Sequence, residues 1–166
     1  MKGTILVAYA SRYGSTREVA ESIASTLRGR MLRVSLRPVE DVYHLEEYVG
    51  VVLGGGIYMG RWHRDARRFA RQFEDELRGL PVAVFALGPT DDVLQHRAGS
   101  EQQFRKTLQK LPFAPIGSAL FGGAVDPRKL HFPFNRMPAA DVRDWDEITA
   151  WAGEIAERFL SLPVAA

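Results

Sequence analysis

The stretch that decides the fold is ILVAYASRYGSTREVAESIAS, residues 5–25. It starts as an apolar run that is typical of a buried strand, and it then passes through small polar residues around Gly14. Apolar residues at helical spacing follow: Val19, Ala20, Ile23 and Ala24. The pattern predicts a strand over Thr4–Tyr9 and a helix over Thr16–Arg28 with Gly29 as its C-cap. A break of this kind between strand and helix often holds a phosphate.

The rest of the 166 residues repeats the alternation of strand and helix. Further strands are predicted over Leu32–Leu36, Gly50–Leu53, Pro81–Leu87 and Ile116–Gly122. Further helices are predicted over Val42–Tyr48, Trp62–Leu77, Gly99–Lys110 and Trp145–Leu160, with an irregular stretch over residues 123–143. Continuous apolar strands between helices indicate an α/β fold, in which a five-stranded, doubly wound parallel sheet carries helices on both faces. We expect a single domain over residues 1–166.

Composition excludes several classes of site. The chain has no cysteine, which excludes disulfides, zinc–thiolate sites and thiol catalysis. The four histidines show no ligand spacing, so no metal site is expected. The net charge is only +2, which does not favour binding to nucleic acid. No leader and no apolar run long enough for a membrane span is evident, and we expect a cytoplasmic protein.

The polar break after the first strand has the features of a phosphate site. Ser11, Ser15 and Thr16 offer hydroxyl groups, and Gly14 allows the backbone to turn. The first amides of the helix that follows are free to bind an anion. The break carries neither the lysine of a nucleotide-binding P-loop nor a GxGxxG pattern. An ordinary capped turn is the alternative interpretation.

Ligands of doubly wound sheets bind at the carboxyl ends of the strands, so two more loops are candidates. They read GGGIYMGRW, residues 54–62, and GPTDDVLQHRAG, residues 88–99. Together with SRYGST, residues 11–16, they resemble the cofactor loops of flavodoxins. The resemblance is closest to the flavodoxin-domain proteins grouped with menaquinone-dependent protoporphyrinogen dehydrogenase. It rests on Ser11-Arg12, on the segment Ile57–Gly60 followed by His63, and on Asp144-Trp145.

The resemblance implies the strand order 2-1-3-4-5 and an FMN cofactor. Its phosphate is expected in the first loop and its isoalloxazine ring between the other two. The implied cofactor-binding residues are Ser11, Arg12, Tyr13, Gly14, Ser15, Thr16, Gly56, Ile57, Tyr58, Gly60, Leu87, Gly88, Pro89 and Thr90. Tyr58 or Trp62 is expected to stack on one face of the ring, although each is equally a candidate core aromatic.

The third loop lacks the aromatic residue that flavodoxins place there, so one flavin face is expected to be open. An open face suits a small aromatic substrate, such as a quinone or porphyrin, or a nicotinamide. Tyr13 or Phe132 is the alternative cover for that face. His63, or else His96, is a candidate proton relay to the flavin, while a lone histidine is more often structural or solvated.

Two basic segments are candidate contacts for a substrate or another partner. Arginines recur at helical spacing as Arg64, Arg67, Arg68 and Arg71, and basic and aromatic residues mix in Asp126–Met137. Each is a candidate contact for an anionic substrate, a quinone or a peripheral membrane surface. The alternative is an ordinary solvated surface, which is the more common role of such an arginine pattern.

The sequence therefore predicts an FMN-dependent oxidoreductase of the protoporphyrinogen, quinone or NAD(P)H type. The alternatives are a non-enzymatic electron carrier that docks a redox protein and a flavodoxin-like binding domain without flavin. The substrate, the electron partner and the oligomeric state stay open.

Overall fold

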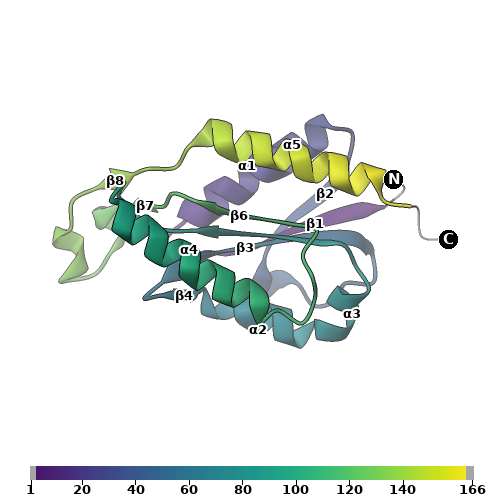
Figure 1. The fold of residues 1–166 in the computed structure, drawn as a ribbon, viewed down its shortest axis with the longest axis horizontal. Helices are drawn as coiled ribbons and strands as arrows, with labels where there is room; N and C mark the ends of the chain where they lie inside the picture. The colour runs from purple at the N-terminus through teal and green to yellow at the C-terminus, as the bar shows by residue number, and fades with distance from the viewer. Residues whose placement is uncertain (1–2, 164–166) are drawn as a thin grey trace.

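The apolar runs form the central sheet of the computed structural model, which describes residues 3–163 (Figure 1). Its five parallel strands are β1 (Thr4–Ala10), β2 (Arg33–Pro38), β3 (Tyr48–Tyr58), β5 (Val82–Leu87) and β6 (Gly117–Phe121). They lie in the order β2-β1-β3-β5-β6, which confirms the predicted order when the five are counted along the chain. A two-residue strand that was not predicted, β4 (Arg61–Trp62), pairs antiparallel with the end of β3.

Helices cover both faces of the sheet. One face carries α1 (Ser15–Gly29) and α5 (Trp145–Ser161). The other carries α2 (Arg64–Gln72), α3 (Glu74–Arg78) and α4 (Leu94–Gln109), as Figure 1 shows. Among residues 3–163, no helix combines the length and the apolar character needed to cross a membrane.

The alternation of side chains along the strands creates two cores. Ile5 and Val7 of β1 are buried against α1 and α5, while Leu6 and Ala8 are buried on the opposite face. Successive side chains of a strand point to opposite faces, so a central strand must be apolar at every position. This accounts for the unbroken apolar runs in the sequence.

Strand β3 is longer than predicted because its glycines belong to the strand. The prediction ended the strand at Leu53 and placed Gly54–Gly56 in a loop. In the structure, a Cβ atom on Gly54 would clash with the ring of Phe85, and one on Gly55 would lie 2.9 Å from the Cβ of His63. The glycines thus let large side chains pack directly on the strand.

The helix predicted over Val42–Tyr48 was wrong. A short 3₁₀ turn, η1 (Val39–Asp41), is followed by extended chain, and β3 begins at Tyr48. Val39, Val42, Leu45 and Tyr48 are all buried in the same core. Their three-residue spacing imitates a helix, although it arises here from an irregular segment that lies along the sheet.

The boundaries of two helices also differ from the prediction. The segment predicted as one helix over Trp62–Leu77 starts at Arg64 and is divided at Phe73 into α2 and α3. Helix α4 starts at Leu94 rather than at Gly99. Its first turns are exposed to solvent and therefore carry no apolar periodicity. Gly29 ends α1, but the left-handed residue beyond the helix is Met31, with φ 66°.

Residues 123–143, expected to be irregular, form an excursion beyond the carboxyl edge of the sheet (Figure 1). Two short strands, β7 (Ala124–Val125) and β8 (Ala140–Asp141), pair antiparallel at its base. Between them lie the 3₁₀ turns η2 (Pro127–Lys129) and η3 (Phe134–Arg136). We call residues 123–143 the excursion below.

Candidate functional site

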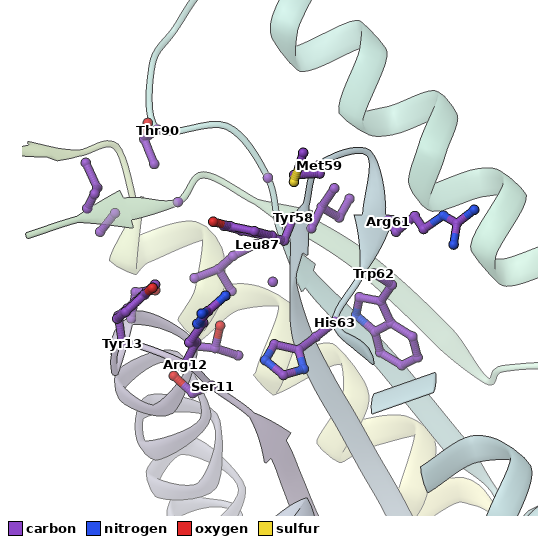
Figure 2. Close-up of a pocket in the computed structure, with 18 of the residues that line it drawn as sticks. Ser11, Arg12, Tyr13, Tyr58, Met59, Arg61, Trp62, His63, Leu87 and Thr90 are labelled. Atoms are coloured by element: carbon purple, nitrogen blue, oxygen red, sulfur yellow. The ribbon is translucent and has the colours of Figure 1, made fainter. Parts of the chain in front are cut away.

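The carboxyl ends of β1, β3 and β5 open onto a cavity of about 860 Å³ (Figure 2). This volume lies within the roughly 300–1,000 Å³ that small-molecule sites occupy. Twelve of the predicted site residues line it: Ser11, Arg12, Tyr13, Ser15, Thr16, Gly56, Ile57, Tyr58, His63, Leu87, Gly88 and Thr90. The other three, Gly14, Gly60 and Pro89, shape the loops without lining the cavity.

The first loop is a turn with free amides at the start of α1. Gly14 is the N-cap residue with φ 94°, a left-handed conformation that favours glycine. Its N–H donates to the Ser11 hydroxyl over 3.0 Å, which closes the loop on itself. The first helical bond runs from the Glu18 N–H to the Gly14 carbonyl. The amides of the three preceding residues, 15–17, therefore have no partner within the helix and are available to an anion.

Thr16 stands out because its side chain is only 3% exposed and yet lines the cavity. No hydrogen bond within residues 3–163 occupies its hydroxyl group, whereas every fully enclosed polar side-chain atom of those residues has a partner. A Cβ atom on Gly56 would lie 3.7 Å from the Thr16 hydroxyl oxygen. The hydroxyl group therefore borders the cavity and is free to bind a ligand there.

The second loop combines an exposed turn with one buried and one open aromatic residue. Met59 and Gly60 take left-handed conformations, φ 48° and 74°, between β3 and β4. Trp62 is buried in the core, and its indole N–H donates to the Gly55 carbonyl over 3.0 Å. Tyr58 is 50% exposed at the cavity, so of the two candidate stacking residues only Tyr58 presents a free ring.

Arg12 lies between two aromatic rings. Its guanidinium carbon is 5.4 Å from the ring centre of Tyr13 and 5.8 Å from that of Tyr58. Figure 2 shows the three side chains converging on the cavity. The cavity thus offers a flat, cationic and aromatic wall, which suits a planar anionic ligand.

His63 caps helix α2. Its Nδ1 accepts the Asp65 N–H over 3.1 Å, so the proton of the neutral ring is on Nε2. Burial lowers the pKa of His63 below its ordinary value of 6.5, with a smaller opposing effect from Asp65. His63 is therefore a neutral hydrogen-bond donor at pH 7 that lines the cavity. His96 instead pairs with Asp91 at 2.9 Å, is exposed, and does not line the cavity.

The third loop is tied to the excursion. The Gly88 N–H donates to the Phe121 carbonyl over 2.7 Å, and the Gly123 N–H donates to the Pro89 carbonyl over 2.8 Å. The excursion then brings Leu130, Phe134 and Met137 to the cavity, none of which was predicted as a site residue. Phe132, one of the predicted covers, is 71% exposed and does not line the cavity. The available signal was the cluster of apolar residues in a loop rich in proline.

Of the four arginines at helical spacing, two line the cavity and two are exposed to solvent. Arg64 and Arg67 line the cavity, and the Arg67 Nε donates to the Trp62 carbonyl over 2.9 Å. Arg68 and Arg71 are exposed away from it. With Arg12 and Arg61, the lining holds four arginines against one carboxylate, that of Asp65. Within the described part of the chain, no three His, Asp or Glu side chains gather as a metal site requires.

The chain is also similar to known proteins in sequence and in fold. The family described as Flavodoxin domain matches residues 6–137. The chain is 24% identical to the protoporphyrinogen IX dehydrogenase [quinone] of Escherichia coli, over 91% of this chain and 93% of that protein. It is 26% identical to the protein of the same name from Leishmania major, over 96% of this chain and 76% of that protein.

Among solved structures, oxidised flavodoxin 1 from Bacillus cereus superposes with a TM-score of 0.60 at 18% identity. The superposition covers 98% of this chain and 100% of the flavodoxin. An identity this low shows the shared fold alone. The family match, however, spans well over half of the sequence and includes the first loop, both ends of the cavity and most of the excursion. The chain therefore belongs to the flavodoxin-domain family.

Proposed function

We propose that the protein is an FMN-dependent oxidoreductase that acts on a small anionic compound with aromatic rings. The best candidate substrate is protoporphyrinogen, whose pyrrole rings are aromatic and which carries carboxylate groups, with a quinone as acceptor. The observation that carries the proposal is the cavity itself. One end has free helix amides and the hydroxyl group of Thr16, which borders the cavity, and the opposite end is open, aromatic and rich in arginine. A phosphate ion alone would use only the first end, and an aromatic compound without a phosphate would use only the second.

The donor set of the first loop fits the phosphate of FMN. The Thr16 hydroxyl group and the amides of residues 15–17 provide neutral donors at a helix N-terminus, where an anion is favoured. The backbone at Gly14 is left-handed, a conformation that glycine adopts more readily than a residue with a side chain. A phosphate ester held here leaves the rest of its molecule to extend along the cavity towards Gly56 and Gly88.

When bound, FMN would supply the electron chemistry of the reaction. The chain would hold its ring between the ends of β3 and β5, where Gly56 and Gly88 permit close approach of the backbone. Tyr58 would stack on the ring, a contact that contributes about 0.5–1.5 kcal/mol beyond burial. His63 would donate a hydrogen bond from Nε2, rather than relay a proton, because its Nδ1 is fixed in the cap of α2.

The proposed substrate class follows from the charge of the open end. Protoporphyrinogen carries carboxylate groups on a large apolar ring, and two relatives bear the name protoporphyrinogen IX dehydrogenase [quinone]. The cavity lining offers arginines for the carboxylates and Tyr58, Leu130 and Phe134 for the ring. A neutral quinone would use only the apolar part of this surface.

The test begins with an absorption spectrum of the purified protein, before and after addition of FMN. We expect flavin bands that persist through gel filtration. We then expect oxidation of protoporphyrinogen in the presence of menadione, measured by the fluorescence of protoporphyrin. A protein that leaves added FMN unbound contradicts the proposal, and a flavoprotein that does not oxidise protoporphyrinogen contradicts the substrate.

A second candidate function, electron transfer to another protein, is favoured by the apolar rim of the cavity. Met59, which lines the cavity, is 91% exposed, and an exposed apolar residue of this kind suits a transient protein contact. Stepwise reduction of the FMN-loaded protein separates the two functions. Two well-separated one-electron steps favour a carrier, whereas a single two-electron step favours the enzyme.

A further inference from the structure

The excursion makes two cationic contacts with the first loop, at places far apart in the sequence. The Lys129 ammonium group donates to the Tyr13 carbonyl over 3.3 Å. The Arg143 guanidinium group donates to the Ser15 carbonyl over 3.2 Å. A cavity of about 520 Å³ separates the two segments elsewhere, so these side chains bridge an otherwise open space.

Arg143 is built into its position. Its side chain is only 9% exposed, and its Nη1 lies 2.6 Å from a carboxylate oxygen of Glu18. Two further bonds, of 2.9 and 2.7 Å, join its Nε and Nη2 to Asp141 in β8. The ring of Trp145 lies against its guanidinium group, 4.8 Å from the ring centre. An arginine with this many partners is held in one orientation, and it therefore also fixes the carbonyl group of Ser15 to which it donates.

The group that Arg143 holds is part of the anion site. The carbonyl of Ser15 and the N–H of Thr16 belong to one planar peptide unit, so fixing the carbonyl fixes the direction of the N–H. The Thr16 N–H is among the free amides of the first turn of α1. Arg143 therefore acts on the anion site through the backbone, without contacting the ligand.

Lys129 has the opposite character, because it is exposed and its charge is not neutralised. Among residues 3–163, no carboxylate forms an ion pair with it. Its ammonium nitrogen lies 3.5 Å from the place that a Cβ atom on Gly14 would occupy, so it sits directly over the turn. The neighbouring Arg128 is instead bound to Asp126 at 2.9 Å, and none of its hydrogen bonds or ion pairs within residues 3–163 reaches the loop.

We infer that the excursion completes the phosphate site: Lys129 supplies positive charge to a phosphomonoester bound by residues 11–16, and Arg143 is a positioning residue that orients the Thr16 N–H towards it. The inference rests on the proposed function, because it names the ligand's phosphate as FMN's. It also extends the proposal, because it makes a segment outside the three strand-end loops responsible for selecting the phosphorylated flavin over riboflavin.

The experiment measures the dissociation constants of FMN and riboflavin by quenching of flavin fluorescence at low salt. We expect Lys129→Met to weaken FMN binding by about fivefold, as for an exposed charge pair. We expect Arg143→Met to weaken it by roughly tenfold or more, because buried charge-assisted bonds are lost. Riboflavin binding should stay unchanged in both variants. Arg128→Met is the matched control and should leave both constants unchanged.

Several results would overturn the inference. Equal losses for FMN and riboflavin in Arg143→Met would assign that residue to general stability, and wild-type FMN binding in Lys129→Met would remove the charge contribution. Lys129 is exposed, so its variant tests the inference even if Arg143→Met fails to fold. The Lys129 effect should also shrink as salt is raised.

Inorganic phosphate separates this inference from the proposed function. If the wild type binds no flavin, the FMN proposal fails. The inference then stands only if phosphate raises the melting temperature of the wild type and raises it less in Lys129→Met. It is overturned if phosphate has the same effect, or none, on both proteins.

Discussion

The two ends of the cavity are built in opposite ways. At the first loop, the Ser11 hydroxyl group accepts a hydrogen bond from the Gly14 N–H, and the side chain of Thr16 is buried. Arg143, from the excursion, donates a hydrogen bond to the Ser15 carbonyl. At the mouth, the turn after β3 carries a side chain, Met59, that is 91% exposed. A rigid end with neutral donors suits a ligand that stays bound, whereas an open and charged end suits a ligand that is exchanged. Under the proposed function, retention of the cofactor and choice of the substrate can therefore be altered separately.

The strongest way to break this contrast is to fill the closed end. In the double variant Ser15→Leu with Thr16→Val, a bulky side chain occupies the phosphate space and the buried hydroxyl group is lost at nearly constant volume. We expect FMN binding to weaken by at least about 100-fold, or ~3 kcal/mol, in a fluorescence titration. Ser25→Leu, on an exposed position of α1, is the control for surface apolarity. Unchanged FMN affinity in the double variant would show that the phosphate lies elsewhere.

The closed end could be predicted from the sequence, because it depends on local chemistry. A strand, a glycine turn and hydroxyl residues at a helix start occur within Ser11–Thr16, and all but Gly14 line the cavity. The order of the parallel strands likewise follows from apolar runs and the family resemblance. Lys129 belongs to a basic segment that was a candidate contact for an anionic substrate. The contacts that Lys129 and Arg143 make with the loop could not be foreseen, since each reaches it from more than a hundred residues away.

The mouth was predicted less well for a related reason. Gly54–Gly56 were predicted as part of a loop, but they form strand because Phe85 and Trp62 pack where their side chains would be. Phe134 lines the cavity although it lies in a segment without any periodic pattern. Such placements depend on packing between distant segments, which one sequence does not encode in a local signal.

The glycines beneath the cavity give the next largest effect, this time on stability. In Gly54→Ala, the new methyl group would collide with the Phe85 ring in a fully buried core, and overpacking of this kind costs about 1–3 kcal/mol. We expect the free energy of unfolding, measured by urea denaturation, to fall by that amount. The control is Gly29→Ala, where nothing lies within 4 Å of the added atom, and this variant should be as stable as the wild type or more so. Equal stability of the two variants would contradict the packing role.

His63 lines the cavity and caps α2, and its titration provides a test by pH. Its folded-state pKa is lowered, so the folded protein binds fewer protons than the unfolded chain below pH 6.5. The stabilisation is complete above that pH and is lost as the pH falls through the lowered pKa. We expect His63→Ala to lose about 1 kcal/mol at pH 7.5 with the helix cap. His63→Asn should keep the cap and remove this part of the pH dependence of unfolding. A wild-type pH profile in His63→Asn would assign the titration to another group.

The smallest effect is expected at the open end, from the charge of Arg64. This side chain is exposed at the cavity, so its attraction to a substrate carboxylate is worth at most about 1 kcal/mol and is screened by salt. We expect Arg64→Met to raise the KM for protoporphyrinogen by roughly two- to fivefold with little change in kcat. The dimethyl ester, which lacks the carboxylate charges, should show no difference between the variant and the wild type. Arg68→Met, on the same helix but away from the cavity, is the matched control. An equal rise in KM for the ester would mean that Arg64 acts by packing, and the charged mouth would then have no part in selecting the substrate.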